Sequence, residues 1–592
     1  MSFDAISNAI PSRRLTREVM VGNVGLGGAN PIRVQSMITC DTMDTEASIG
    51  QTLDLVAVGC EIVRITAPTV KDAANLENIV AGLRAMNCPV PIVADIHFKP
   101  DAALEAVKWV EKVRVNPGNF ADSKKFQILE YTDVEYAAEL ERIRQRFTPL
   151  VQLCLQRGVA MRIGTNHGSL SDRIMNRYGD TPLGMVESAL EFARIARDLG
   201  YHAFTFSMKS SNPKVMINAY RLLIARLDAE GPDWNYPIHL GVTEAGDGED
   251  GRIKSAIGIG SLLADGIGDT VRVSLTEDSV HEIPVARALV ANVRLNEAVA
   301  RLSYDPFSYR RRVTERLEVG GVGLGGKETM RVFTTQPKWD AVAHKLDKLG
   351  DYRPEIVLEE SALLSIDPRH AGAVAAVNAS PHPRLVTVAD GVDMTPIAAF
   401  RLLAAQVQER HPILLKDQLS PYPQSEFLGT LLTAATNIGA LLCDGIGDAV
   451  LVQGEEAPGQ SLRLSYNTLQ AAGARIFKTD YVACPSCGRT LFNLQTTTAR
   501  IKEATANVAK NNVGNLVKVV HADLFEQDLS GASVITLYLL PSLNVKLMPK
   551  LMKELKPGTR IVSHAFDMGD WKPEKELDVD GRKVYYWTIP KK

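Results

Sequence analysis

The first part of the chain alternates short runs of β-branched and apolar residues with longer stretches whose apolar positions recur at helical spacing. The runs predict strands and the stretches between them predict helices. Predicted strands are 32–37, 62–66, 91–96, 112–116, 159–165, 202–207, 238–243 and 270–275, and predicted helices include 102–110, 183–199 and 212–229. Eight such strand–helix units predict an α/β fold with a (β/α)8 TIM barrel over residues 1–304.

A doubly wound parallel sheet is the competing arrangement for this segment. It would place Gly-x-Gly-x-x-Gly between the first strand and its helix, and no such motif stands there. The glycine-rich stretch 22–28 comes before the first predicted strand. We therefore interpret it as a hairpin that closes the barrel floor rather than as a phosphate-binding loop.

The opening and the close of the predicted barrel recur later in the chain, in the same order. Residues 21–28, Val-Gly-Asn-Val-Gly-Leu-Gly-Gly, recur at 319–326 as Val-Gly-Gly-Val-Gly-Leu-Gly-Gly. Residues 260–272 recur at 439–451 around a shared Asp-Gly-Ile-Gly-Asp. A match this dense at both ends indicates an internal repeat.

The second copy has a shorter interior and different chemistry. Leu451 and Gln453 stand where the first copy has Arg272 and Ser274. We expect residues 305–460 to form an inserted, reduced barrel-like α/β domain that is structural rather than catalytic.

Composition narrows the class of protein. The chain has 592 residues, 45% hydrophobic and 23% charged, as expected of a soluble globular protein with three or four domains. A net charge of -3 argues against coating a nucleic acid. We find neither a secretory signal nor an apolar run long enough to span a bilayer, so we expect no membrane partner. Seven scattered cysteines favour the reducing cytoplasm.

Charged and polar residues gather at the carboxyl ends of the predicted strands. They are Arg64, Asp95, His97, Arg114, Arg162, Asn166, Lys209, Glu244, Arg272 and Ser274. A single strand-end arginine is more often a structural ion-pair member, and a single histidine is more often a satisfied core residue. Five cations on one rim exceed what Asp95 and Glu244 can neutralise, which predicts a ligand with more than one phosphate.

A Cys-Pro-Ser-Cys sequence at Cys484 and Cys487 supplies half of a metal-binding knuckle. From its spacing alone, a zinc knuckle, an iron–sulfur ligand pair and a redox dithiol all remain open.

Taken together, about residues 1–500 resemble the 4-hydroxy-3-methylbut-2-enyl diphosphate synthase family, in its large form with an inserted second barrel-like domain. The resemblance rests on Gln35-Ser-Met, Asp95-Ile-His97-Phe, Arg114-Val-Asn-Pro-Gly-Asn, Asn166-His-Gly-Ser, Asp265-Gly-Ile-Gly-Asp-Thr-Val-Arg and the cysteine motif. It implies an oxidoreductase of isoprenoid biosynthesis that binds 2-C-methyl-D-erythritol 2,4-cyclodiphosphate. A 4Fe–4S cluster and two electrons from ferredoxin or flavodoxin would open the ring and expel water. A homodimer is left open.

The resemblance also implies roles for the strand-end residues. The substrate-binding candidates are Arg64, Arg114, Arg162, Lys209, Arg272 and Ser274. The catalytic candidates are Asp95, His97, Asn166 and Glu244. Of these, Asp95, His97 and Asn166 would face the carbon skeleton of the substrate.

The chain departs from the family at the cluster ligands. The family uses three cysteines and one glutamate, and Cys484 and Cys487 match the first two. No cysteine follows Cys487 in this sequence. We therefore interpret residues 461–502 as the remnant of a cluster domain that has two of the four expected ligands.

The tail, residues 503–592, resembles the back half of a class I S-adenosylmethionine-dependent methyltransferase, a partial Rossmann-like α/β fold. The glycine-rich turn that cradles the cofactor in such folds is missing from it. We place the joint near residues 500–502. Two alternatives to the family reaction follow: a non-catalytic diphosphate-binding barrel, and a vestigial S-adenosylmethionine-binding tail in which Asp523 would face the adenine.

Overall fold

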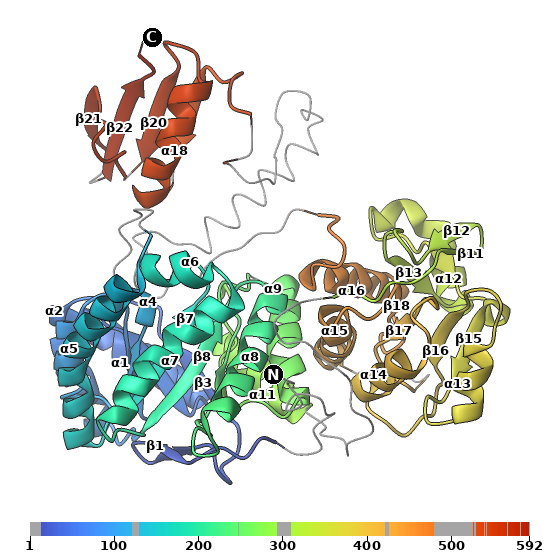
Figure 1. The fold of residues 1–592 in the computed structure, drawn as a ribbon, viewed down its shortest axis with the longest axis horizontal. Coiled ribbons are helices and arrows are strands. Elements are labelled where there is room, and N and C mark those ends of the chain that lie inside the picture. The colour runs from blue at the N-terminus through green and yellow to red at the C-terminus, as the bar shows by residue number, and fades with distance from the viewer. Residues whose placement is uncertain are drawn as a thin grey trace. The chain divides into compact units, whose positions relative to one another are not determined.

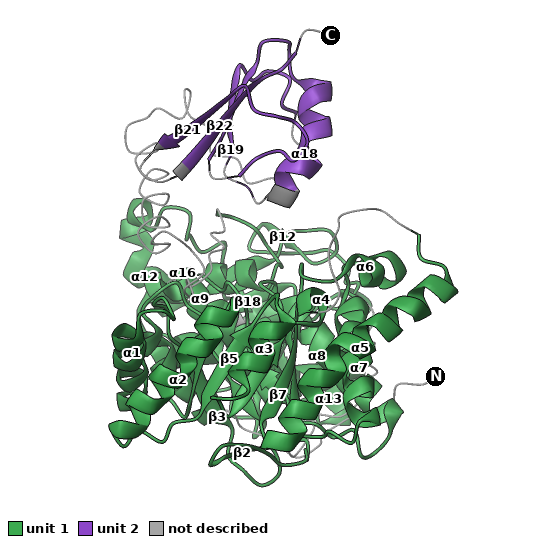
Figure 2. Ribbon diagram, turned by 90° about the vertical axis from the view of Figure 1, so that its left-hand side faces the viewer, with its two compact units in different colours: residues 1–501 green, residues 502–592 purple. Residues whose placement is uncertain are grey.

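Two compact units, residues 1–501 and 502–592, make up the chain in the computed structural model (Figure 2). The structure describes residues 13–120, 130–246, 248–292, 310–420, 426–478, 525, 528–537, 539, 541–564, 566–579 and 582–590. The boundaries of the four predicted domains remain predictions. None of the described helices is both long enough and apolar enough to cross a membrane.

The first unit contains the predicted barrel (Figure 1). Its eight-stranded sheet has the order β8-β7-β6-β5-β4-β3-β10-β9, and every neighbouring pair is parallel. A parallel bridge between Phe206 and Ile238 joins the two ends of that order, which closes the barrel. The strands are β3 (Arg33–Met37), β4 (Ile62–Thr66), β5 (Ile92–Ile96), β6 (Lys112–Val115), β7 (Ala160–Asn166), β8 (Phe204–Lys209), β9 (His239–Leu240) and β10 (Thr270–Val271). The predicted TIM barrel is confirmed.

Helices follow the strands, as a (β/α)8 arrangement requires. They are α1 (Thr45–Ala57), α2 (Val70–Ala85), α3 (Pro100–Ala106), α4 (Pro117–Phe120), α5 (Asp133–Arg157), α6 (Asp172–Tyr178), α7 (Pro182–Asp198), α8 (Pro213–Glu230), α9 (Gly248–Ser255), the π-helix η2 (Ala256–Gly260), α10 (Ser261–Ala264), the 3-10 turn η3 (Ser279–His281) and α11 (Glu282–Ala291). The longest, α5, begins with a capping box between Thr132 and Glu135 and ends at Gly158, whose φ of 66° suits glycine.

The glycine-rich stretch before β3 forms the predicted hairpin. Strands β1 (Val19–Val21) and β2 (Val24–Leu26) pair antiparallel, and their apolar side chains pack against Ile62, Val93 and Ala160. Those three residues lie at the amino-terminal ends of β4, β5 and β7, so the hairpin covers the barrel floor and leaves the opposite end for a ligand.

The repeat in the sequence is also a repeat in structure. Hairpin β11 (Leu317–Val319) and β12 (Val322–Leu324) has the register of β1 and β2, and β13 (Arg331–Thr334) pairs with β18 (Ala449–Leu451) as β3 pairs with β10. Even the floor contacts match. Arg33 donates to Glu61 at 2.8 Å, and Arg331 donates to Glu355 at 3.0 Å.

The second copy is reduced, as the sequence predicts. Its four-stranded sheet has the order β14-β13-β18-β17, beside the parallel pair β15-β16. The remaining elements are α12 (Gln336–Val342), η4 (Ala343–Leu349), β14 (Ile356–Val357), η5 (Glu360–Ala362), β15 (Leu363–Ile366), α13 (Ala371–Asn378), β16 (Leu385–Val388), α14 (Pro396–Gln406), β17 (Leu414–Lys416), α15 (Phe427–Cys443) and α16 (Pro458–Ala471).

The two copies pack through equivalent glycines. A Cβ added at Gly260 would lie 2.3 Å from Thr436 Oγ1, and one added at Gly439 would lie 2.4 Å from Ile257 Cγ1. Each glycine therefore receives the side chain that stands three residues before its counterpart. These reciprocal contacts let η2 and α15 approach closely.

Four charged side chains also join the two copies by ion pairs. Arg221 of α8 donates to Asp265 at 2.8 Å and to Asp444 at 2.7 Å. Arg401 of α14 donates to Asp265 at 2.7 Å and to Asp444 at 2.8 Å. Both aspartates come from the repeated Asp-Gly-Ile-Gly-Asp segments, so each copy contributes one arginine and one aspartate.

The second unit is a small α/β fold. Its sheet has the order β19-β20-β22-β21, formed by β19 (Val534–Leu537), β20 (Arg560–His564), β21 (Lys575–Val579) and β22 (Arg582–Thr588), with helix α18 (Pro541–Glu554). β19 and β20 are parallel, whereas β22 runs antiparallel to β20 and β21. Trp587 is fully buried in its core and donates to the carbonyl oxygen of Trp571 at 2.9 Å.

Candidate active site at the barrel mouth

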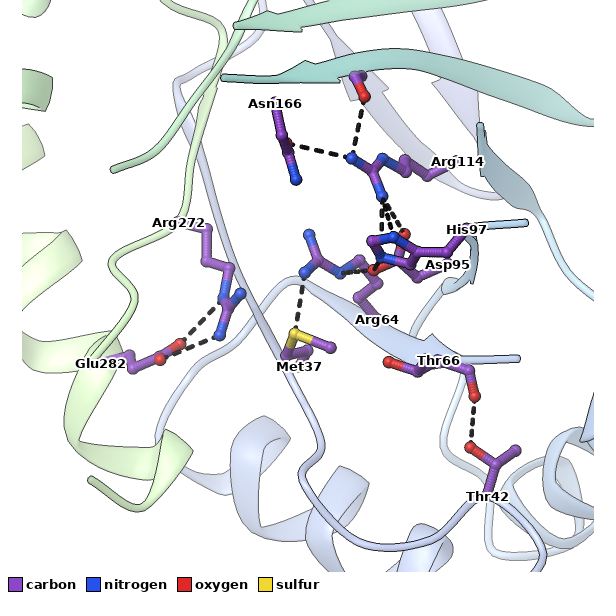
Figure 3. A network of polar contacts seen from close by, with 11 residues as sticks. Met37, Thr42, Arg64, Thr66, Asp95, His97, Arg114, Asn166, Arg272 and Glu282 are labelled. Carbon is purple, nitrogen blue, oxygen red and sulfur yellow. Dashed lines mark hydrogen bonds and ion pairs between the residues drawn. The ribbon is translucent and has the colours of Figure 1, made fainter. Parts of the chain in front are cut away.

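Polar side chains from six of the eight strands meet inside the barrel, at the carboxyl ends where TIM-barrel enzymes place their active sites. Figure 3 shows part of this cluster. The predicted residues found here are Arg64 on β4, Asp95 on β5 with His97 just after it, Arg114 on β6, Arg162 and Asn166 on β7, Lys209 on β8, and Arg272 and Ser274 just after β10. All of them are buried except Asn166, which is half-buried.

Asp95 is the centre of the cluster. One carboxylate oxygen lies 3.0 Å from Arg114 Nη1, and the other lies 3.3 Å from both Arg64 Nε and His97 Nε2. Burial by itself would raise the pKa of Asp95, but Arg64, His97 and Arg114 outweigh it and hold that pKa well below its ordinary range. Asp95 is therefore a fixed negative charge that orients two guanidinium groups.

Arg114, on β6, links Asp95 of the neighbouring strand β5 to the neighbour on its other side, β7. Its Nη2 donates to the Gly164 carbonyl oxygen at 2.9 Å and to Asn166 Oδ1 at 3.2 Å. A Cβ at Gly164 would lie 2.8 Å from Arg114 Nε and 2.9 Å from Ser207 Oγ. Glycine at this strand position thus leaves the room through which the guanidinium passes.

Arg272 has a carboxylate partner that the sequence analysis missed. Glu282, in the first turn of α11, accepts from Arg272 Nε at 3.2 Å and from Nη2 at 3.1 Å. Ser36 Oγ and the backbone N–H of Leu275 also donate to Glu282, at 2.5 and 3.1 Å. The carboxylate expected at this edge, Glu244, is instead exposed and has a φ of 53°.

Arg162 and Lys209 form no ion pair in the described part of the chain. Their side chains are almost entirely buried, at 3% and 5% exposed. Arg162 Nε and Nη1 have no hydrogen-bond partner there. Burial, with Arg64 and Arg162 close by, lowers the pKa of Lys209 well below its ordinary range. A guanidinium stays charged at any biological pH, so the mouth retains an excess of buried positive charge.

The predicted metal ligands, Cys484 and Cys487, lie outside the described residues. The other five cysteines are spread through the cores of the barrel and the insert, and burial raises the pKa of Cys60, Cys154 and Cys443 to about 12, which keeps them as thiols. No group of His, Cys, Asp and Glu in the described residues is arranged to hold a metal ion.

The fold and this mouth define a TIM-barrel protein that presents buried cations at the catalytic end of the barrel. The model of the GcpE TIM-barrel domain matches residues 16–287. A protein of Akkermansia muciniphila named 4-hydroxy-3-methylbut-2-en-1-yl diphosphate synthase (flavodoxin) is 57% identical over 84% of this chain and 86% of its own length. One of the same name from Leptospira interrogans is 43% identical over 84% of this chain and 87% of its own.

The chain therefore belongs to the 4-hydroxy-3-methylbut-2-en-1-yl diphosphate synthase family, a family of oxidoreductases. The predicted resemblance is confirmed.

A second similarity concerns the tail. The model of the ANTKMT methyltransferase domain matches residues 481–575, a range that takes in Cys484 and Cys487. A solved RNA methyltransferase from Salinibacter ruber, in complex with S-adenosyl-L-homocysteine, is 51% identical over 16% of this chain and 60% of its own, with a TM-score of 0.15. The predicted methyltransferase-like tail is confirmed by the domain model.

Proposed function

We propose that the barrel mouth binds 2-C-methyl-D-erythritol 2,4-cyclodiphosphate, the substrate of the reaction that the family resemblance implies. In that reaction two electrons and two protons reduce the cyclic diphosphate, a ring carbon–oxygen bond breaks, and one oxygen leaves as water. The product is 4-hydroxy-3-methylbut-2-enyl diphosphate. Flavodoxin, which the relatives carry in their names, is the electron donor we propose for that family reaction.

One observation carries this proposal: Arg162 and Lys209 are buried, and neither forms an ion pair with a carboxylate of the described residues. Burying an unpaired charge is costly, and proteins retain such charges where a ligand neutralises them. A diphosphate supplies two negative charges and several acceptor oxygens, which suit a guanidinium fork and an ammonium group together.

The residues around Arg162 and Lys209 would orient these cations or contact other parts of the substrate. Asp95 fixes the guanidinium groups of Arg64 and Arg114, so these enter the complex already oriented, with little entropy left to lose. Arg272 and Ser274 would contact the diphosphate from the β10 side. His97 and Asn166 would face the carbon skeleton, where their side chains can accept or donate hydrogen bonds to hydroxyl groups.

The donor set of this chain does not fit the four-ligand cluster that the family reaction implies. Its sequence offers Cys484 and Cys487; of its other cysteines, four are buried in the cores and Cys40 is half-buried. We therefore assign this chain the binding and orientation of the cyclic diphosphate, and we derive no electron-transfer step from its residues.

Replacing Arg162 or Lys209 with alanine is expected to weaken binding of the cyclic diphosphate by about 1.5–3 kcal/mol, because each loses a charge-assisted hydrogen bond. Isothermal titration calorimetry on the full chain measures this loss. Arg162→Lys separates charge from shape: it keeps the charge but cannot form two parallel hydrogen bonds, so we expect an intermediate affinity.

The matched control is Arg142→Ala, which removes an arginine from the outer helix α5, where it pairs with Glu139. Its affinity should equal that of the unchanged chain. The midpoint temperature of thermal unfolding should not fall for the Arg162 variant as its affinity does. In the free protein the substitution removes a buried charge that forms no ion pair with the described residues, so stability has little to lose. If all variants bound the cyclic diphosphate with equal affinity, the proposal of an anion site at the barrel mouth would be refuted.

The match to a methyltransferase domain favours testing one further activity. The cofactor in class I methyltransferases is held by the glycine-rich turn after the first strand. Because the tail lacks that turn in its sequence, we expect no heat of binding when S-adenosylmethionine is titrated into the full chain. Saturable binding would instead establish a working cofactor site in residues 481–592.

A further inference from the structure

His239 faces the barrel interior below the mouth. It begins β9, and its neighbours Ile238 and Leu240 both pack in the main hydrophobic core. Because side chains alternate along a strand, His239 points to the opposite side, into the barrel. Its side chain is 0% exposed. Branched aliphatic residues normally fill such interior positions, so a histidine is unusual here.

Neither ring nitrogen of His239 has a hydrogen-bond partner in the described residues. The backbone carbonyl oxygen of the same residue is satisfied, since it accepts from Tyr220 Oη at 2.5 Å. Buried polar atoms are almost always paired, and an unpaired imidazole inside a barrel therefore needs an explanation.

The next inward position on the same segment of chain is Gly241. A Cβ there would lie 2.8 Å from Lys209 Nζ and 2.9 Å from the Arg272 carbonyl oxygen. The Lys209 ammonium thus occupies the space that a side chain at 241 would take. His239 is consequently a near neighbour of the group to which we assign the diphosphate.

The charged groups facing His239 are nearly all positive. They are Arg64 on β4, Lys112 on β6, Arg162 on β7 and Lys209 on β8. Arg64 shares Asp95 of β5 with Arg114, and Arg272, which follows β10 and acts on Lys209, is paired with Glu282. Burial first, and then Arg162, Lys209 and Lys112, hold the pKa of His239 well below its ordinary value. The imidazole is therefore neutral in the free protein.

We propose that His239 is a positioning residue that takes up a proton when the cyclic diphosphate enters the mouth. This inference rests on the function proposed above. Two negative charges beside Lys209 and Arg162 would offset the cations that now keep the ring neutral, and a nearby anion favours the protonated imidazole. The resulting cation would hold the diphosphate more tightly as the pH falls.

The ligand itself is not the source of such an effect. In the cyclic diphosphate each phosphorus carries a single acidic oxygen, which is already ionised at neutral pH. Any proton taken up on binding is therefore taken up by the protein, and calorimetry can count it.

The experiment titrates the cyclic diphosphate into the full chain at neutral pH, in buffers with different ionisation enthalpies. The slope of observed enthalpy against ionisation enthalpy gives the number of protons taken up. His239→Gln keeps a polar side chain that cannot titrate, and it should lower this number by about one proton. The affinity of the unchanged chain should rise by up to about tenfold per unit fall in pH, and the variant should lose most of that dependence.

His202→Gln is the control, because His202 is exposed at the opposite end of β8, where it contacts the hydroxyl group of Tyr236. It should behave as the unchanged chain does. Equal proton uptake by His239→Gln and the unchanged chain would overturn the inference while leaving the proposed function intact. Zero uptake by the unchanged chain would overturn it without any variant. Absence of binding would refute both.

Discussion

Reduced flavodoxin and the cyclic diphosphate are expected to yield no product with this chain, because its sequence supplies two of the four cluster ligands that the family resemblance implies. After anaerobic reconstitution we expect fewer than about two irons per chain, since a complete 4Fe–4S cluster requires four protein ligands in this family. Iron analysis and electron paramagnetic resonance measure the cluster, and product formation measures the reaction. The diphosphate should nevertheless bind.

A hybrid chain isolates the cause. Residues 502–592 are exchanged for the terminal segment of the Akkermansia muciniphila relative, which is 57% identical to this chain where the two align. We expect about four irons and turnover in the hybrid, and the loss of both when Cys484 is replaced by alanine. Turnover by the unchanged chain would contradict this account and would mean that another chain completes the ligand set.

Replacing Arg401 with alanine is expected to destabilise the first unit by about 3–5 kcal/mol, the usual consequence of breaking a buried ion pair from one side. Arg401 bonds Asp265 and Asp444 together with Arg221, and the side chains of the two aspartates are 8% and 4% exposed. Without Arg401 two buried carboxylates share a single guanidinium. Urea unfolding followed by circular dichroism should show the loss as a lower midpoint.

Arg316→Ala is the matched control for that measurement. Arg316 also belongs to the insert and also binds a carboxylate, Glu328 at 2.8 Å, but more than half of its side chain is exposed. Solvent-exposed pairs contribute little, so its midpoint should hardly move. If both variants unfolded at the same urea concentration, the buried ring would be no stronger than a surface pair.

Most of the barrel could be predicted from local pattern alone, because each strand is a short apolar run between helices. The ends of the last two strands could not. The runs 238–243 and 270–275 predict six residues each, whereas β9 and β10 contain two. Beyond these residues the chain no longer pairs as a strand, and Glu244 adopts a left-handed conformation. The apolar pattern of the sequence continues past this point, so it does not predict where strand pairing ends.

The candidate site, too, could be predicted from the sequence only in part. Strand-end position identified Arg64, Asp95 and Arg114, because parallel strands bring their carboxyl ends to one rim. Glu282 was missed, since its pairing with Arg272 requires knowing where α11 returns to the barrel. His239 stood inside a predicted strand, and alternation with Ile238 and Leu240 was the available signal for its inward orientation.

The two modules match at the barrel floor and differ at the mouth, which shows where the two copies have diverged. Arg33 with Glu61, and Arg331 with Glu355, preserve one architecture at the end that carries no ligand. At the other end Leu451 and Gln453 have displaced an arginine and a serine. Laboratory evolution that restores an arginine at position 451 and a serine at position 453 would begin from a module that keeps the floor contacts of the first copy.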